Sequence, residues 1–189
     1  AKERFPEPLS VRPFDGLIHV MKGNSNEAEG ILMHVLSENP NQPFVNHSLG
    51  LLKRSTGEPN EAEQFLREEI RLHPPAIPAR RTLVEVLAEQ KRYGAQIDPL
   101  KAIAAIEKPN TLTMHSLAQA LFNLGRYDEA KDETQRCIKI DNKYPGCWML
   151  WANVLSKTGQ PTEGKKAYDK AVKLMNANRK SRPGPTRPQ

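Results

Sequence analysis

Apolar residues along the chain follow a short, helix-like period that itself recurs at a much longer interval. Glycines mark the long interval, because Gly23 and Gly57 are 34 residues apart, as are Gly125 and Gly159. Lys91 occupies the remaining slot on the same 34-residue grid. Self-similarity at such an interval predicts an array of repeated structural units rather than one large shared core.

Two helices are predicted in each unit, one before and one after the turn slot. Pairs such as Leu49-Gly50 and Leu117-Ala118 precede the slot, and their small residue lets two helix backbones approach closely. Breakers such as Pro40 end the second helix, because proline lacks an N–H. After the slot, three columns spaced by four residues define an inward helix face: Ala28, Ala62, Gln96, Ala130 and Gly164; Leu32, Leu66, Leu100, Thr134 and Tyr168; and Leu36, Ile70, Ala104, Ile138 and Val172.

This pattern resembles the tetratricopeptide repeat (TPR) family. The fourth and fifth units carry the resemblance best, in Leu117-Ala118, Gly125, Tyr127, Ala130 and Cys137, and in Trp148, Trp151-Ala152, Gly159, Tyr168 and Ala171. The resemblance implies an all-α fold, an α-solenoid of five TPR helix-turn-helix repeats that form a right-handed superhelix. The repeats are expected at residues 9–42, 43–76, 77–110, 111–144 and 145–178, between an extended lead-in (1–8) and a basic, proline-rich, disordered tail (179–189).

The two ends of the array differ from the middle. The first unit has polar residues and Pro13 within its first helix, which predicts a short or frayed helix there. Either the lead-in caps this repeat or a preceding domain or partner covers it, and self-association through residues 5–22 is a further expectation. In the fifth unit, a run of charged residues is expected to solvate the second helix: Lys165, Lys166, Asp169, Lys170 and Lys173.

Composition supports an array and weakens the case for nucleic acid. Only 38% of the 189 residues are hydrophobic, which fits units that each bury a stripe. The net charge is +6, but four of those charges lie in the last eleven residues, so the remainder carries +2. No apolar run reaches the ~18–20 residues of a membrane helix, and no signal-peptide layout is present. A cytoplasmic location is expected, or a periplasmic one if a leader preceded Ala1.

Candidate chemistry is sparse. The sequence contains no catalytic or phosphate-binding motif and no set of histidines at metal-ligand spacing, so we expect neither an enzyme nor a metal or other cofactor. Cys137 and Cys147 are interpreted as two buried thiols, since free cysteine packs as a small hydrophobe. A disulfide between them stays an alternative that requires an oxidising compartment.

The TPR resemblance implies that first helices line a concave groove for a partner peptide or helix. One groove column is expected to hold Phe14, Ser48, Thr82, Ser116 and Leu150. Beside it, His47, Arg81 and His115 form a ladder that could pair with an acidic group of the partner. The predicted partner-binding residues are Phe14, Phe44, His47, Leu51, Arg81, Glu85, Leu112, His115, Gln119 and Asn153.

The function expected from this resemblance is that of a non-enzymatic protein-interaction adaptor. TPR domains that hold chaperone C-terminal carboxylates use Lys, Asn and Arg at set positions, where this chain has His47, Leu51, Thr82, Leu112 and Ser116. We therefore expect no such clamp. The alternatives are a nucleic-acid-binding helical repeat, and the repeat module of a larger enzyme or of an envelope, secretion or pilus assembly.

Overall fold

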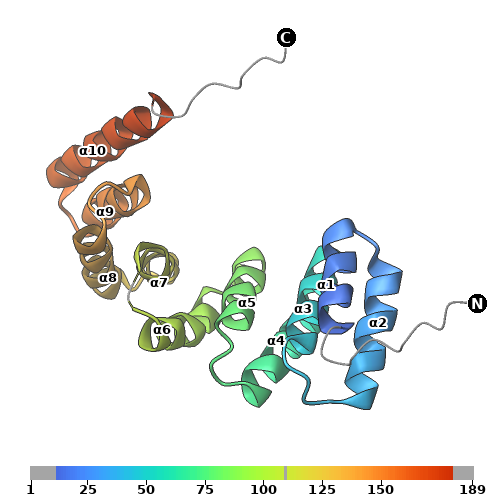
Figure 1. Cartoon of the computed structure of the whole chain (residues 1–189). Coiled ribbons are helices and arrows are strands. Elements are labelled where there is room, and N and C mark those ends of the chain that lie inside the picture. Colours follow the sequence, from blue (N-terminus) through green and yellow to red (C-terminus); the bar gives the residue numbers. More distant parts are fainter. Residues whose placement is uncertain (1–11, 109, 181–189) are drawn as a thin grey trace, which may run out of the picture. The chain divides into compact units, whose positions relative to one another are not determined.

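The structure is a computed structural model that describes residues 12–108 and 110–180. Every regular element in this part of the chain is helical (Figure 1). The lead-in, Pro109 and residues 181–189 lie outside the described residues, so the expectations for the lead-in and for most of the tail are not addressed. The all-α fold of paired helices predicted from the sequence is confirmed.

The chain divides into two compact units, Ala1–Arg92 and Tyr93–Gln189. In the first unit, helices α1 (Arg12–Lys22) and α2 (Ser25–Glu38) form one pair, and α3 (Val45–Ser55) and α4 (Pro59–Leu72) form the next. Helix α5 (Ile77–Glu89) then packs against both α3 and α4. Each first helix therefore stacks on the pair that precedes it, as an array requires.

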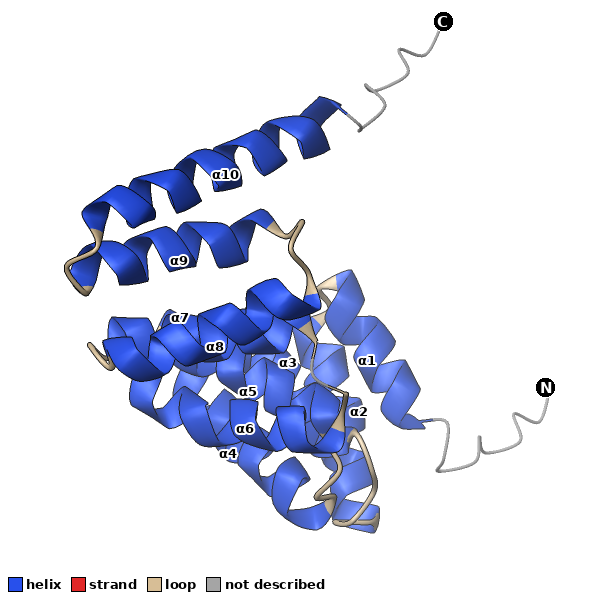
Figure 2. Ribbon diagram, turned by 90° about the vertical axis from the view of Figure 1, so that its left-hand side faces the viewer, coloured by secondary structure: helices blue, strands red, loops and turns tan. Residues whose placement is uncertain are grey.

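The second unit begins with a short 3₁₀ helix, η1 (Tyr93–Gln96), and α6 (Ile97–Ile106), which both pack against α7 (Thr111–Asn123). Helix α7 pairs with α8 (Tyr127–Ile140), and α9 (Pro145–Lys157) pairs with α10 (Pro161–Lys180), as Figure 2 shows. The boundary between the units falls inside the third predicted repeat, between α5 and η1.

The turn slots have the backbone that the 34-residue grid implies. The four slot glycines have φ between +75° and +81°, a region that glycine enters without steric cost: Gly23, Gly57, Gly125 and Gly159. Lys91 adopts φ +57° in the same slot. The turn geometry therefore persists in the third repeat even where the sequence offers no glycine.

Small residues in first helices admit the inward column of second helices. A Cβ atom on Gly50 would lie 2.6 Å from Cγ of Leu66, and one on Gly16 would lie 2.5 Å from Cγ of Leu32. Both leucines are fully buried. The predicted close approach within each helix pair is confirmed at these two positions.

First helices also bury a second stripe, which faces the preceding repeat. In α3 it consists of Val45, Ser48 and Leu52, and Val45 packs against Leu32 and Val35 of α2. The equivalent buried residues are Ala79, Thr82 and Val86 in α5, and Cys147, Leu150 and Val154 in α9. The expectation that Ser48, Thr82 and Leu150 line an open groove is therefore wrong, because the stacking of repeats covers them.

Cys137 of α8 and Cys147 of α9 form a disulfide, with their Cα atoms 5.9 Å apart. The interpretation as two separate thiols is therefore wrong. The reason is geometric: Cys147 begins the buried stripe of α9 that faces the fourth repeat, and Cys137 belongs to the face of α8 that receives it. The bond joins the fourth repeat to the fifth.

Helix ends differ from the prediction at two places. Helix α1 has 11 residues, as α3 does, so the expectation of a short or frayed first helix is wrong. Pro13 is its second residue, where a backbone N–H has no partner within the helix and its loss costs nothing. Helix α10 extends to Lys180, so Arg179 and Lys180 belong to a helix and not to a tail.

Candidate functional site: the first-helix surface

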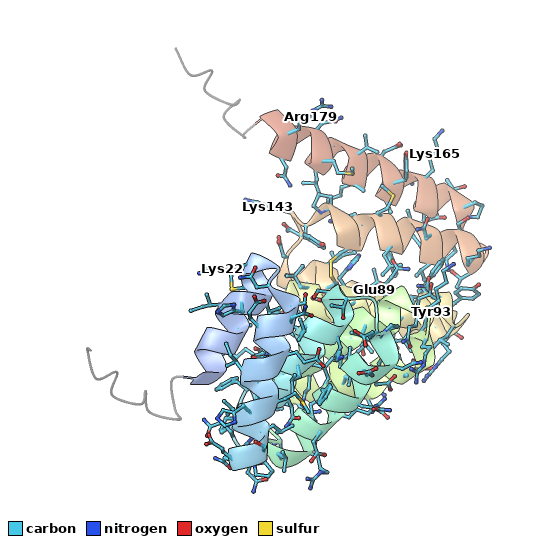
Figure 3. The ribbon with its side chains drawn as sticks, turned by 90° about the vertical axis from the view of Figure 1, so that its right-hand side faces the viewer. Lys22, Glu89, Tyr93, Lys143, Lys165 and Arg179 are labelled. Atoms are coloured by element: carbon cyan, nitrogen blue, oxygen red, sulfur yellow. A yellow bond between two sulfur atoms is a disulfide. The ribbon has the colours of Figure 1, made fainter. Side chains whose placement is uncertain are left out.

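A hollow of about 390 Å³ lies on the first helices of the first unit. We call it the first-unit hollow; α1, α3 and the end of α5, where Figure 3 labels Glu89, line it. Its lining residues are Leu17, Val20, Met21, Leu51, Arg54, Ser55 and Glu89. The hollow thus combines four apolar side chains with a polar edge, as small binding sites commonly do.

Met21 is the most exposed large apolar side chain of the described residues, with 81% of its surface accessible. It lies in the last turn of α1, beside Leu17 and Val20, which are half-buried. Methionine is flexible and polarisable, so it adapts to differently shaped apolar partners. The hollow is therefore suited to an apolar side chain presented by another molecule.

The polar edge of the hollow is an ion-pair cluster between α3 and α5. Arg54 Nη2 donates to Glu89 Oε1 at 2.6 Å, and Arg54 Nη1 donates to Glu85. The hydrogen bond to Glu89 is the main cause that raises the pKa of Arg54. Because Arg54 is already paired with two carboxylates, the cluster fixes α3 against α5 and adds little positive charge to the surface.

His47 connects the same two helices about two turns earlier on α3. Its Nε2 atom lies 3.1 Å from Thr82 Oγ1, and the ring is half-buried. Burial lowers the pKa of His47, although the charge of Glu69 opposes this. His47 is therefore neutral at pH 7. Of the predicted ladder in this unit, only the half-buried Arg81 carries a positive charge.

Glu69 of α4 holds the beginning of α3, a role that sequence reasoning missed. Only 2% of this residue is exposed, and its carboxylate accepts from the backbone N–H of Phe44 at 2.9 Å and of His47 at 3.4 Å. An acid at a helix N-terminus satisfies free N–H groups and the helix dipole. It also fixes Phe44, which has φ +68° and is half-exposed. The signal in the sequence was a charge between the inward residues Leu66 and Ile70.

In the second unit, the predicted groove residues lie on α7 and α9. Leu112 is 59% exposed at the start of α7, and Gln119 Nε2 donates to Asn123 Oδ1 at 3.0 Å. His115 packs edge-on against Tyr144, with ring centroids 5.6 Å apart, and burial lowers its pKa. The remaining predicted residue of this unit, on α9, is exposed: Asn153.

A family model described as "Anaphase-promoting complex, cyclosome, subunit 3" matches residues 100–171. Human tetratricopeptide repeat protein 7A is 32% identical over 94 residues, which are 50% of this chain and 11% of that protein. Small glutamine-rich tetratricopeptide repeat-containing protein 2 of Mycosarcoma maydis is 26% identical over 47% of this chain and 25% of that protein.

The chain is a tetratricopeptide-repeat protein. A third relative, the chloroplastic PsbB mRNA maturation factor Mbb1 of Chlamydomonas reinhardtii, is 31% identical over 51% of this TPR chain and 14% of its own length. The chain thus spans only a small part of the curated relatives that it matches.

Solved structures of MamA share the fold of this TPR chain. One has a TM-score of 0.81 at 20% identity, covering 94% of this chain and 98% of the other. MamA from Desulfovibrio magneticus RS-1 has a TM-score of 0.80 at 14% identity, covering 92% and 98%. At these identities the likeness concerns the fold alone.

The structure places five of the ten predicted groove residues of this TPR chain in the first unit: Phe44, His47, Leu51, Arg81 and Glu85. Of these, Leu51 lines the hollow, and Glu85 belongs to the ion-pair cluster at its edge. Four lie in the second unit, and the side chain of Phe14 lies outside the described part. The hollow residues of α1 were missed, because this helix was expected to be frayed and its Leu17 and Met21 were not considered.

Within residues 12–108 and 110–180 of the TPR chain, no three His, Cys, Asp or Glu side chains are grouped so that they could hold a metal ion. No helix in these ranges is long and apolar enough to cross a membrane.

Proposed function

We propose that this TPR chain is a protein-interaction scaffold whose first-helix surface binds an extended segment of a partner protein. The observation that carries the proposal is the first-unit hollow, in which Leu17, Val20 and Leu51 surround space beside the exposed Met21. An apolar side chain of the partner would fill this hollow. TPR folds are typical of scaffolds that hold other proteins, and the proposal assigns the chain no catalytic role.

A neighbouring residue would extend the contact, because Phe44 offers an exposed ring at the start of α3. In the second unit, a separate contact would involve Leu112, His115, Gln119 and Asn153. Because burial keeps the two histidines neutral at pH 7, they add no charge that would favour an acidic partner, and apolar anchoring is the larger contribution.

The test compares two exposed methionines of the first unit. Peptides are selected on the full chain from a displayed random library, and their affinities are measured by fluorescence anisotropy. Met21→Asp should weaken binding about 10- to 100-fold, because burying a methionine contributes roughly 1.5–3 kcal/mol. Met33→Asp is the control, since Met33 is 45% exposed on α2 and does not line the hollow.

Equal affinities of the wild type and the Met21→Asp variant would exclude the hollow as the binding site. Circular dichroism of both variants checks that the helices remain intact. Equal weakening by Met21→Asp and Met33→Asp would show a nonspecific effect of added negative charge, and would likewise count against the proposal.

RNA binding is the second candidate, and two observations favour it. The matched Chlamydomonas relative is described as an mRNA maturation factor, and α10 carries six basic residues against two acidic ones. Binding driven by phosphate contacts loses affinity steeply as salt rises. A single-stranded RNA probe whose affinity does not fall between low and physiological salt, or which does not bind, would eliminate this candidate.

A further inference from the structure

A second hollow, of about 350 Å³, lies between α9 and α10, the helix pair of the fifth repeat (Figure 2). Both tryptophans of the chain line it. We call it the tryptophan pocket, and its walls and edges include Trp148, Trp151, Glu163, Lys166, Ala167 and Lys170. None of these residues belongs to the predicted groove or to the first-unit hollow. The function proposed above therefore leaves the tryptophan pocket without a role.

The two tryptophan rings form the walls of this pocket. Trp148 Nε1 donates to the backbone oxygen of Asn142 at 2.9 Å, and the Lys170 ammonium lies 3.7 Å from the centroid of the Trp148 ring. Both rings are half-buried and pack against a buried cluster that includes Ala167. A site whose walls are already in place loses little entropy when a ligand binds. The pocket is therefore suited to a side chain that enters without rearranging it.

Ala167 is the smallest residue at its repeat position. The other four repeats each place a larger, buried or half-buried side chain there: Ile31, Phe65, Pro99 and Glu133. In the second repeat this side chain is aromatic, and Phe65 packs against the buried cluster that contains Leu49, the counterpart of Trp151. Alanine in the fifth repeat leaves space beside Trp151 open. An aromatic side chain of another molecule can enter this space, as Phe65 fills the corresponding place from within its own repeat.

The edge of the tryptophan pocket is positive toward one end. Lys166 and Lys170 line it, and in the described part of the chain neither forms an ion pair. Glu163 lies toward the other end, seven residues from Lys170 and thus about 10 Å away along α10. A carboxylate beside the bound ring would therefore be attracted to the two lysines, whereas an ammonium group there would be repelled.

We propose that the tryptophan pocket binds an aromatic side chain of a partner protein that has acidic residues next to it in sequence. The aromatic ring enters beside Trp151, and the neighbouring carboxylates meet Lys166 and Lys170. A stacked nucleic-acid base fits less well, because stacking platforms present an open ring face. Here Lys170 already covers a face of Trp148, and both tryptophan rings are half-buried.

Intrinsic fluorescence tests the proposal, because the two tryptophans of the chain both line the pocket. The probe is a short, tryptophan-free peptide with Phe-Asp-Asp at its centre, titrated into the full chain up to millimolar concentration. Its binding should change the tryptophan emission saturably. The affinity should be about fivefold higher than that of a peptide with Phe-Lys-Lys at its centre. Lys170→Glu should reverse this preference.

Three further variants sharpen the experiment. Lys165→Glu is the matched control, since Lys165 is exposed on the same helix and does not line the pocket, and it should leave both affinities unchanged. Ala167→Phe should abolish the emission change, because its own ring then fills the pocket. Circular dichroism checks that this variant folds, and if it does not, the pair Lys170→Glu and Lys165→Glu decides. Met21→Asp should have no effect, which separates this pocket from the first-unit hollow.

Several results would overturn the inference. They are the absence of a saturable emission change, equal affinities of the two peptides for the wild type, and equal effects of Lys170→Glu and Lys165→Glu. Loss of the emission change in Met21→Asp would also count against it. A uridine oligonucleotide that displaces the peptide and itself changes the emission would make nucleic acid the occupant. Sedimentation should show monomers, because dimers that Ala167→Phe disperses would make a second copy the occupant.

Discussion

Replacing Gly57 with alanine should destabilise the protein, whereas the same replacement at Gly30 should stabilise it. Gly57 has φ +81° in the turn between α3 and α4, and a Cβ atom there would meet nothing within 4 Å. The cost is therefore purely conformational. Gly30 lies exposed inside α2, where an added Cβ also meets nothing within 4 Å. The two sites differ only in backbone conformation.

The magnitudes follow from that difference. A left-handed conformation costs an L-residue about 1–2 kcal/mol, and alanine recovers roughly 0.4–1 kcal/mol by restricting the unfolded chain. Gly57→Ala should therefore lower the free energy of unfolding by about 1 kcal/mol. Gly30→Ala should raise it by about 1 kcal/mol, the difference in helix propensity.

Lys91 provides the converse test, because it occupies the turn slot with φ +57° and pays the cost that glycine avoids. Lys91→Gly should be stabilising by up to about 1 kcal/mol, after the greater unfolded-state entropy of glycine is subtracted. The other four turn slots of the described chain already hold glycine, so Lys91 is the slot residue at which a change to glycine can be tested.

Urea unfolding followed by circular dichroism measures all three variants. With a slope of about 2 kcal/mol per molar urea, a change of 1 kcal/mol shifts the midpoint by about 0.5 M. The midpoint should fall for Gly57→Ala and rise for Gly30→Ala and Lys91→Gly. Shifts of the same sign for the two alanine variants would refute the reasoning from the 34-residue grid to turn geometry.

Three further predictions concern packing, the disulfide and pH. Gly50→Ala should destabilise by about 1–3 kcal/mol in urea unfolding, because its Cβ would overlap Leu66; unchanged stability would contradict the close approach. Reducing the α8–α9 disulfide, which spans 10 residues, should cost up to about 3 kcal/mol, and labelling of thiols before reduction would contradict the bond. Burial lowers the pKa of His47 and His115, so the folded state takes up fewer protons than the unfolded state. The free energy of unfolding should therefore fall as the pH drops through 6.5. A His47→Gln/His115→Gln variant that keeps the full pH dependence would contradict this prediction.

The sequence was sufficient to predict the paired helices and their inward columns. Gly50 and Leu66 could be placed opposite each other because both belong to columns that recur every 34 residues. Periodic signals of this kind depend on many copies, so one substitution such as Lys91 does not remove them. The structure differs from the prediction where a residue's environment depends on the neighbouring repeat.

Ser48 and Thr82 show why part of the surface could not be predicted. Their polar side chains suggested an open groove, but stacking on the preceding repeat buries both. Small polar residues tolerate such burial because their hydroxyls bond to the backbone of their own helix, as Ser48 does with Phe44 O at 2.8 Å and Thr82 with Pro78 O at 3.1 Å. The disulfide was missed for a related reason, since only the joint between repeats brings the two cysteines together.

The first-unit hollow was missed because one proline was overweighted. Pro13 suggested a broken first helix, but at the second helical position it removes no hydrogen bond. Helix α1 therefore forms and brings Leu17 and Met21 beside Leu51 of α3. Sequence pattern predicts which helices exist, whereas the side chains that meet on their surface depend on the packing of helices from different repeats.

Hydrogen exchange of the full chain, with and without a peptide selected on it, tests the proposed binding surface most directly. We predict that the peptide slows exchange in the first helices of the first unit, α1, α3 and α5, with the largest effect around Met21 and Leu51. The exchange rates of amides in α2, and in the turns of α4 that lie away from α3 and α5, should be unchanged. Slowed exchange confined to α2 and α4, with none in α1 or α3, would contradict the account.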